Sequence, residues 1–307
     1  MKSISVKQER EFEKSNVLKR KEKYLQTNPL DRYKNDEPYR KKIDFIKSKL
    51  AKTNGLILDI GGNTAGEATI LKTFGYKFVV GDINEFALSI SKERIEKFQL
   101  DMPYYVALDA HILPFENEVF DQVTIIEALH HFVNYKSVLD EVSRVLKPGG
   151  NFVSLEPYAY NPIRKASEIR DYFKGTIEKS FSVRQLKKLL ESSNFQNINI
   201  EFISTGRSKW KLEEIPLFRR WFARLHGYLN EKFPKIFGNL LITAKKNGQF
   251  NDVSHNINFI DILHCPITKE KLHMDYEHNI LINESKTLGY KFYNEIPVLI
   301  KDDAIKL

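Results

Sequence analysis

Three aspartates and a histidine pair in the first half of the chain have the chemistry to bind a nucleoside and to move a proton. Asp59, Asp82 and Asp109 each stand at or near the end of a short apolar run, and His130 and His131 follow a fourth run. The Asp82 carboxylate can accept hydrogen bonds from both hydroxyls of a ribose, each contributing on the order of 1.5 to 3 kcal/mol. Asp109 can accept one from an adenine amino group. Histidines titrate near neutral pH, so the pair is a candidate base beside a nucleoside site.

A turn rich in small residues follows the first aspartate. Residues 55–60 (GLILDI) predict a buried strand, and the spacing of the next apolar residues predicts a helix that begins near Ala65. Gly61 and Gly62 carry no side chains where a ligand must approach the backbone, and the helix start points free N–H groups at the turn. Rossmann dehydrogenases share such a turn, so the turn alone leaves a dehydrogenase open.

The elements that must position the other residues alternate between strands and helices. Residues 78–83 predict a second strand that ends about 20 residues after the glycine turn, where a ribose-binding acid is expected. A third strand ends at Asp109, and a fourth covers about 122–126. A helix then stops at Pro148 and a fifth strand follows at 151–157. This alternation predicts an α/β fold with a parallel sheet.

Five motifs in this order resemble the class I S-adenosylmethionine-dependent methyltransferases, in particular their small-molecule, type 11-like branch. They are LDIG at 58–61, the acidic strand end at Asp82, DAHILPFENEVFD at 109–121, ALHH at 128–131 and RVLKPGG at 144–150. The resemblance covers about residues 50–248. It implies a Rossmann-like seven-stranded sheet with helices on both faces and an antiparallel last strand. The LPF loop and the KPGG turn have no role in holding a second nucleotide, which argues against a dehydrogenase.

The resemblance implies S-adenosyl-L-methionine as the cofactor. The family usually has glycines where this chain has Asn63 and Ala65, so Asn63 either narrows the cofactor site or bonds to the cofactor. A degenerate fold that binds no cofactor and serves as a scaffold stays open. The residues that the resemblance assigns to cofactor binding are Asp59, Gly61, Gly62, Asn63, Asp82, Ile83, Asp109, Ala110 and Glu127.

The same resemblance places the ALHH motif beside the methionine end of the cofactor. His130 and His131 are therefore the candidate catalytic residues, as a base or as a substrate-orienting pair, although one histidine of such a pair often packs under the sheet. The chain lacks the Asn-Pro-Pro-Tyr or Asp-Pro-Pro-Tyr sequence that positions exocyclic amines, which disfavours N-methylation of bases. Tyr158, Tyr160 and Arg164, after the fifth strand, are candidate substrate contacts or ordinary loop residues.

Residues 205–238 read as an insertion between the last two strands of the sheet. From Leu217 to Leu229, apolar and aromatic residues recur at helical spacing, with arginines on the other side. The pattern has two interpretations, which are a cap over the active site and a helix that lies on a membrane surface or a lipid-linked substrate.

Residues 255–307 resemble the zinc-ribbon-like activator domains that partner tRNA and protein methyltransferases. Those domains often carry CPxC and a later cysteine pair, whereas this chain has Thr268 in the second position and Cys265 as its one cysteine. His264, His273 and His278 do not fill the missing positions, so we expect no structural metal. An unrelated hairpin module is the alternative. The matching positions are Leu263, Cys265, Pro266, Leu272, Tyr290, Ile296, Pro297, Val298, Asp303 and Ala304.

These boundaries divide the 307 residues into three parts. An N-terminal helical segment at 1–45, with Tyr33 and Tyr39 as a candidate lid, precedes the methyltransferase domain at 46–248 and a small β-rich domain at 255–307 that docks in cis. The single cysteine and the absence of a signal peptide or a long apolar stretch predict a cytoplasmic protein.

The charge distribution bears on the partner. Net charge is +7 for residues 1–50, −6 for 51–156, +10 for 157–248 and −3 for 249–307. A basic rim attracts phosphates, acidic substrates or a membrane surface, or is simply a solvated face. We therefore expect methyl transfer to a hydroxyl or similar nucleophile of a small molecule, sugar or lipid-linked intermediate, with no obligate protein partner. The alternatives are an RNA methyltransferase, disfavoured because the chain has no RNP motif or GXXG loop, and a non-catalytic scaffold.

Overall fold

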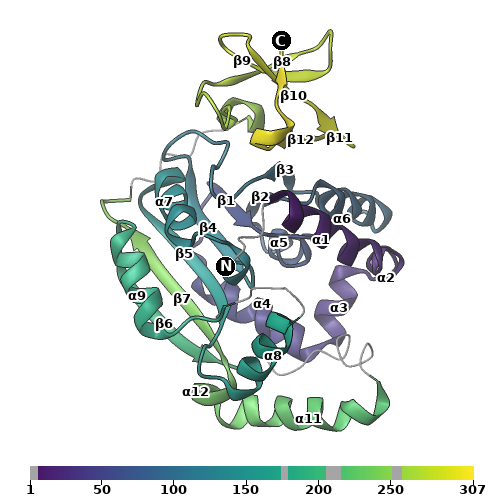
Figure 1. Cartoon of the computed structure of the whole chain (residues 1–307), viewed down its shortest axis with the longest axis vertical. Helices are drawn as coiled ribbons and strands as arrows, with labels where there is room; N and C mark the ends of the chain where they lie inside the picture. Colours follow the sequence, from purple (N-terminus) through teal and green to yellow (C-terminus); the bar gives the residue numbers. More distant parts are fainter. Residues whose placement is uncertain (1–5, 174–178, 205–215, 251–257) are drawn as a thin grey trace.

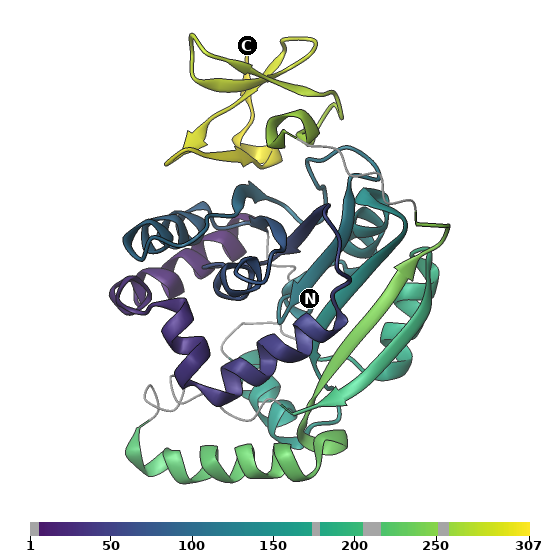
Figure 2. The same cartoon turned by 180° about the vertical axis from the view of Figure 1, so that it is seen from behind.

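The computed structural model describes residues 6–173, 179–204, 216–250 and 258–307. A mixed sheet of nine strands lies at its centre, and a small antiparallel sheet lies at one end (Figures 1 and 2). The large sheet has the strand order β11-β12-β3-β2-β1-β4-β5-β7-β6. Among the helices in these ranges, none combines the length and the apolar character that a bilayer crossing requires.

Seven of the nine strands correspond to the sheet that the sequence predicts. β1 is paired in parallel with β2 and β4, and β7 runs antiparallel to both β5 and β6. Every residue of β1 is buried, as expected for a central parallel strand. The strands are β1 (Leu56–Ile60), β2 (Lys77–Asp82), β3 (Tyr104–Leu108), β4 (Phe120–Ile126), β5 (Leu146–Pro157), β6 (Phe195–Ile203) and β7 (Asn239–Lys246).

Helices cover both faces of this sheet (Figure 2). The helices that follow the strands are α5 (Gly66–Lys72), α6 (Glu85–Lys97), η1 (Leu129–His131), α7 (Tyr135–Val145), α8 (Pro162–Phe173) and α9 (Val183–Ser192). Successive strand residues point to opposite faces, so Leu58 packs in the core with α7 and α9, and Ile57 packs in the core with α5 and α6. Side-chain caps define where helices begin: Asn84 accepts a hydrogen bond from the Ala87 N–H at the start of α6.

The N-terminal segment forms four helices that pack against the domain. They are α1 (Val6–Leu18), α2 (Lys21–Gln26), α3 (Pro29–Asn35) and α4 (Glu37–Lys49). Val17 and Leu25 pack on α6, and Ile43 and Ile46 of α4 are fully buried in the core that contains Ile57. The charged pattern of this segment therefore conceals an apolar stripe that fixes it to the sheet.

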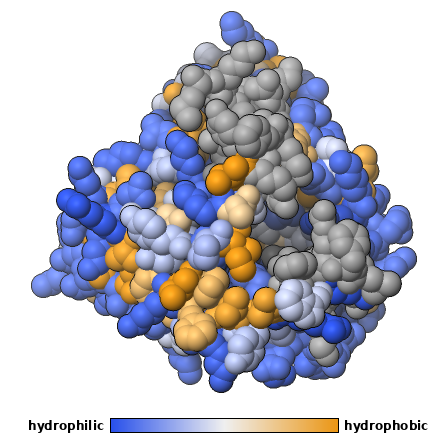
Figure 3. All heavy atoms as spheres, turned by 60° about the horizontal axis from the view of Figure 1, so that its bottom comes forward, coloured by the Kyte–Doolittle hydropathy of each residue, from blue (hydrophilic) through white to orange (hydrophobic). Residues whose placement is uncertain are grey.

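The described part of the predicted insertion contains one long helix, α11 (Leu217–Lys232), and one short helix, α12 (Pro234–Phe237). The remainder of the insertion, 205–215, lies outside the described residues. α11 lies along one end of the molecule, opposite the C-terminal domain (Figure 1), and Figure 3 shows apolar residues on the surface at that end.

The C-terminal domain departs from the expected separate module because two of its strands join the large sheet. β12 pairs in parallel with β3, with Val298 opposite Ala107 and Leu299 opposite Leu108. An open strand edge has unpaired N–H and C=O groups, and β12 satisfies those of β3. The sheet therefore has nine strands instead of the expected seven. The domain's elements are η2 (Phe259–Ile262), β8 (Leu272–Asp275), β9 (Ile280–Asn283), β10 (Leu288–Tyr290), β11 (Phe292–Tyr293), β12 (Ile296–Leu299), η3 (Lys301–Asp303) and β13 (Ile305–Lys306).

Polar and aromatic contacts supplement this strand pairing. The rings of Tyr104 and Phe259 stack with centroids 4.8 Å apart. The Arg10 guanidinium of α1 donates to Glu85 of α6 at 2.8 Å and to Asp303 at 2.7 Å, so the N-terminal helix, the central domain and the C-terminal domain meet at one arginine.

Cys265 lies in the apolar core of the C-terminal domain. Its sulfur is 3.1 Å from the Tyr290 hydroxyl and accepts from the Thr268 N–H at 3.3 Å. Within the described ranges, no three histidines, cysteines or acidic residues come together as metal ligands. A closed structural zinc site needs four ligands.

We predict that the purified protein carries well under one equivalent of zinc per chain, because no three potential ligands come together among the described residues and the domain is held by an apolar core that it shares with the large sheet. Elemental analysis after purification without added metal measures this. Its control is a melting curve with and without a chelator, which we expect to coincide. One zinc per chain that is lost together with stability on chelation would contradict the prediction.

Candidate active site

A cavity of about 1130 Å³ opens where the parallel strands end at their carboxyl termini. Ligands of open α/β sheets bind at this edge, next to the point between β1 and β4 where the strand order reverses. The N-terminal helices, α8 and α11 complete its walls. The lining includes all the predicted cofactor and catalytic residues, which are Asp59, Gly61, Gly62, Asn63, Asp82, Ile83, Asp109, Ala110, Glu127, His130 and His131.

The turn after β1 has a backbone that only particular residues tolerate. Gly61 has φ +73°, and a Cβ on it would lie 2.5 Å from the Cβ of Ala128. Asn63 and Ala65 also adopt positive φ, at 47° and 50°. The Asn63 N–H donates to Asp82 at 2.8 Å, while its buried side-chain Oδ1 has no hydrogen-bond partner. A buried acceptor of this kind is costly unless a ligand satisfies it, so Asn63 is suited to bind a donor on a cofactor.

Asp59 and Asp82 are buried carboxylates that face the cavity from neighbouring strands. Burial raises the pKa of Asp59 to about 7, although the hydroxyl of Thr124 donates to it at 2.6 Å and opposes the shift. Burial also raises the pKa of Asp82 to about 6, against the backbone N–H groups of Asn63 and Asn84. A ligand that donates hydrogen bonds or carries positive charge would stabilise the ionised form of both carboxyl groups.

Asp109 lies at the end of β3 with a partner that the sequence did not identify. Its Oδ1 accepts from the backbone N–H of His111 at 2.9 Å and lies 2.7 Å from the ring Nδ1. Burial alone would raise the pKa of Asp109, but these hydrogen bonds from His111 lower it. Asp109 is therefore held as an oriented carboxylate at the cavity wall, with Oδ2 available to a ligand amino group.

Glu127 belongs to a partly buried ion-pair cluster that reaches the N-terminal segment. Lys42 of α4 lies 3.0 Å from Glu127 and 2.5 Å from Glu67 of α5. Burial by itself would lower the pKa of Lys42, but the charges of Glu127 and Glu67 raise it. Because Lys42 and the buried Tyr39 both line the cavity, α4 is a wall of the site.

The two histidines after β4 have different surroundings. The Nδ1 of His130 lies 2.7 Å from Glu156 of β5, whose side chain is fully buried and also accepts from the Leu129 N–H at 2.9 Å. His131 is exposed, and its ring centroid is 4.1 Å from that of His130. When Nδ1 donates to Glu156, Nε2 of His130 has a free lone pair, which is the state of a base.

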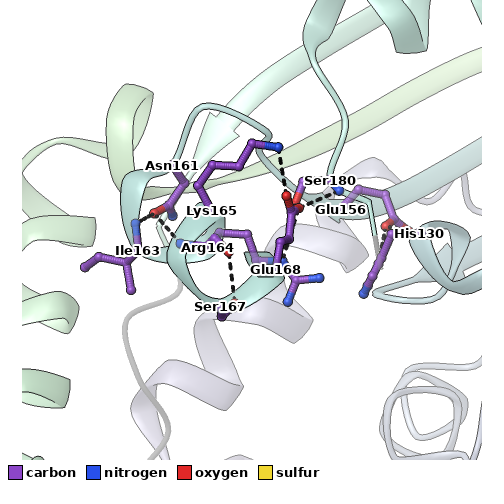
Figure 4. Close-up of polar contacts among 9 residues, drawn as sticks. All are labelled: His130, Glu156, Asn161, Ile163, Arg164, Lys165, Ser167, Glu168 and Ser180. Atoms are coloured by element: carbon purple, nitrogen blue, oxygen red, sulfur yellow. Dashed lines mark hydrogen bonds and ion pairs between the residues drawn. The ribbon is translucent and has the colours of Figure 1, made fainter. Parts of the chain in front are cut away.

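Of the three candidate substrate contacts, the cavity lining includes Arg164 and omits the two tyrosines. Arg164 donates to the Ser180 hydroxyl at 3.2 Å (Figure 4). Tyr158 packs edge-on against Phe202 and Tyr160, and the Tyr160 side chain is 70% exposed. Arg164 is thus the one of these three candidate contacts that lines the same cavity as the histidine pair.

Comparison with known proteins assigns the central part of the chain. Residues 58–154 match the family model described as a methyltransferase domain, Methyltransf_11. The ubiquinone/menaquinone biosynthesis C-methyltransferase UbiE of Zymomonas mobilis is 32% identical over 115 residues, which are 38% of this chain and 48% of that protein. A probable phthiotriol/phenolphthiotriol dimycocerosates methyltransferase of Mycobacterium ulcerans is 30% identical over 170 residues, 53% of this chain and 59% of that protein. The chain spans about half the length of these relatives.

The fold is similar to that of a solved methyltransferase. Phosphoethanolamine N-methyltransferase 2 of Haemonchus contortus, in complex with phosphomonomethylethanolamine and S-adenosylhomocysteine, gives a TM-score of 0.54 at 17% identity, covering 69% of this chain and 53% of that one. The cradle around Gly61, the unpaired acceptor of Asn63 and the oriented acids Asp82 and Asp109 fit a nucleoside cofactor of this kind. Residues 58–154 therefore form an S-adenosylmethionine-dependent methyltransferase domain.

Proposed function

We propose that the protein transfers a methyl group to a hydroxyl, or to a carbon activated by a hydroxyl, of a lipid-like small molecule. The observation that supports this most directly is the buried Glu156–His130 pair at the wall of the cavity. S-adenosylmethionine supplies the methyl group on a positively charged sulfur. The acceptor must lose one proton when its oxygen or carbon gains the methyl group, and a positioned base accelerates such a transfer.

The roles of the residues follow from their contacts. His130 accepts the acceptor's proton on Nε2, and Glu156 stabilises the resulting imidazolium through the hydrogen bond at Nδ1. Gly61, Asn63, Asp82 and Asp109 hold the cofactor. Arg164 lies on the side of the cavity formed by α8, where it can orient an anionic or polar group of the acceptor.

The proposed substrate class rests on cavity size and on relatives. A cavity of about 1130 Å³ exceeds the roughly 300 to 1000 Å³ of sites that hold one drug-sized ligand, so it has room for a cofactor and part of an acceptor. The relatives from Zymomonas and Mycobacterium carry names that refer to quinones and to a long-chain lipid. A lipid-like acceptor is consistent with both.

We predict that protein incubated with methyl-labelled S-adenosylmethionine and fractionated cell extract transfers label to the organic-soluble fraction. Little label should enter total RNA, because the basic segments carry no RNA-reading motif. The second candidate, an RNA methyltransferase, is favoured by the +10 charge of residues 157–248. Saturable labelling of one RNA species would overturn the lipid-like assignment in its favour. Absence of S-adenosylhomocysteine binding in calorimetry would instead indicate a scaffold.

We also propose that the C-terminal domain acts in cis like the activator domains that it resembles. The support is its position, since β12 covers the β3 edge and His264 donates from its N–H to Pro114 in the loop that follows Asp109. The domain thereby stabilises the loop at the adenine end of the cofactor site.

A further inference from the structure

The helices of the insertion expose an apolar surface beside the active site. On α11, Trp221, Leu225 and Tyr228 are spaced four and three residues apart and therefore share one side of the helix. Their residues are exposed by 62%, 39% and 56%. Phe233 and Ile236 continue the exposed apolar surface to α12, and Figure 3 shows this end of the molecule with apolar residues gathered among polar ones.

The same surface is strongly basic. Residues 217–237 contain five arginines and lysines against one acidic residue, Glu231. That acid lies 3.0 Å from Lys41 of α4, so its charge is compensated within the molecule. Arg224, Lys232 and Lys235 are exposed. The surface therefore presents cations around large apolar and aromatic side chains.

These helices also form part of the cavity wall with their other side. His226 and Asn230 of α11 and Phe237 of α12 line the cavity. On neighbouring α8, Arg164 lines the cavity while Ile163 is both a lining residue and 39% exposed. A ligand that leaves a surface in contact with α8, α11 and α12 thus enters the cavity that His130 lines.

We propose that the exposed side of α8, α11 and α12, called here the docking face, binds the surface of a membrane that contains anionic lipids. An interfacial helix combines apolar and aromatic residues that enter the headgroup region with basic residues that contact lipid phosphates. A second copy of the chain is the weaker occupant, because a symmetric contact would bring the same cations together. A protein bound to the membrane through the docking face would present its cavity to lipid-like acceptors. This consequence rests on the proposed function, whereas membrane binding by the docking face does not.

The test is sedimentation of the full-length protein with two kinds of vesicle, phosphatidylcholine alone and a mixture with about one third phosphatidylglycerol. We expect stronger binding to the anionic vesicles, and weaker binding as salt rises. Leu225→Glu/Ile236→Glu should reduce binding at least about tenfold because two apolar anchors are lost. Arg224→Glu/Lys235→Glu should reduce binding to the anionic vesicles by a similar factor and binding to neutral vesicles much less.

Matched controls change equivalent residues away from the docking face. Leu18→Glu/Ile267→Glu and Lys286→Glu/Lys291→Glu alter exposed residues on α1 and in the C-terminal domain, and both should bind vesicles like the unchanged protein. Melting curves and S-adenosylhomocysteine affinity establish that each variant is folded. If Leu225→Glu/Ile236→Glu does not fold, Arg224→Glu/Lys235→Glu still tests the proposal.

Three results would overturn the proposal. They are the absence of vesicle binding, equal binding by the docking-face variants, and a dimer in sedimentation velocity that Leu225→Glu/Ile236→Glu dissociates without vesicles. The last would make the docking face a self-interface. Methyl transfer to a detergent-solubilised extract is measured separately. If the protein transfers methyl groups but does not bind vesicles, only the docking face is rejected. If it binds vesicles but transfers no methyl groups, the proposed function is rejected.

Discussion

His130→Ala is expected to lower kcat by at least about a hundredfold, because general-base catalysis typically contributes about 10² to 10⁴. The side chain also lines the cavity, but its smaller replacement leaves the hydrogen bonds of Asp82 and Asp109 intact. S-adenosylhomocysteine affinity should therefore stay within about twofold of its original value. Single-turnover label transfer and calorimetry measure the two quantities independently.

Glu156→Gln tests the base by a separate route. The glutamine amide can place its NH₂ opposite Nδ1 of His130, which makes Nδ1 the acceptor and puts the imidazole proton on Nε2. An imidazole in that tautomer cannot take the acceptor's proton, so we expect a loss approaching that of His130→Ala with little change in KM. A purely structural role of Glu156 would instead lower the melting temperature and leave the pH dependence of kcat unchanged.

The exposed neighbour supplies the matched control. His131→Ala removes an exposed ring of the same type whose centroid lies 4.1 Å from that of His130, and we expect less than about a fivefold change in kcat because His130 and Glu156 stay in place. If His131→Ala were the more damaging change, the base would have been assigned to the wrong histidine.

The sequence predicted the histidine pair but could not distinguish its members. The distinction depends on Glu156, which lies 26 residues from His130 and reaches it because β5 pairs with β4. The end of the fifth strand was predicted, whereas the direction in which each histidine points is set by the short helix η1. Side-chain partners across neighbouring strands follow from register, which local patterns do not specify.

The N-terminal segment shows the same limit. Its charged pattern favours a surface helix, and the apolar spacing of Tyr39, Ile43 and Ile46 is the one local sign of a buried side. Lys42 lies between these positions, and its partners Glu67 and Glu127 are far along the chain. The inward position of a partly buried lysine can be predicted only when the residues that supply its counter-charges are known.

The strands and motifs of the central sheet were the most predictable part, since buried parallel strands read as continuous apolar runs. The nine-stranded sheet was not predictable, because the short apolar sequence of β12 is equally suited to a strand in a small independent module. Its pairing with β3 is a tertiary contact between residues about 190 positions apart.

Cofactor affinity is expected to fall as pH decreases below about 6, by up to about tenfold per pH unit, and Asp82 is the reason. Burial raises the pKa of Asp82 to about 6 in the protein without ligand. Ribose hydroxyls donate to the ionised carboxylate, so below that pH binding must also remove a proton. Asp82→Ala and Asp82→Asn should each weaken S-adenosylhomocysteine binding at least about tenfold at pH 8, and the asparagine variant should lose the dependence attributable to this group.

Stability of the ligand-free protein should change in the opposite direction with pH. A carboxyl whose pKa is raised on folding contributes stability below its unfolded pKa and loses that contribution as pH rises through its folded value. For Asp82 and Asp59 this loss occurs from about pH 4 up to about 6 and 7 respectively. Asp59→Asn and Asp82→Asn should therefore raise the melting temperature at pH 8 and have little effect at pH 4. Calorimetric titrations measure the affinity for S-adenosylhomocysteine over this pH range, and melting curves measure the stability. If affinity and stability changed in the same direction with pH, or if affinity did not depend on pH, the Asp82 carboxylate would not be the group that binds the cofactor.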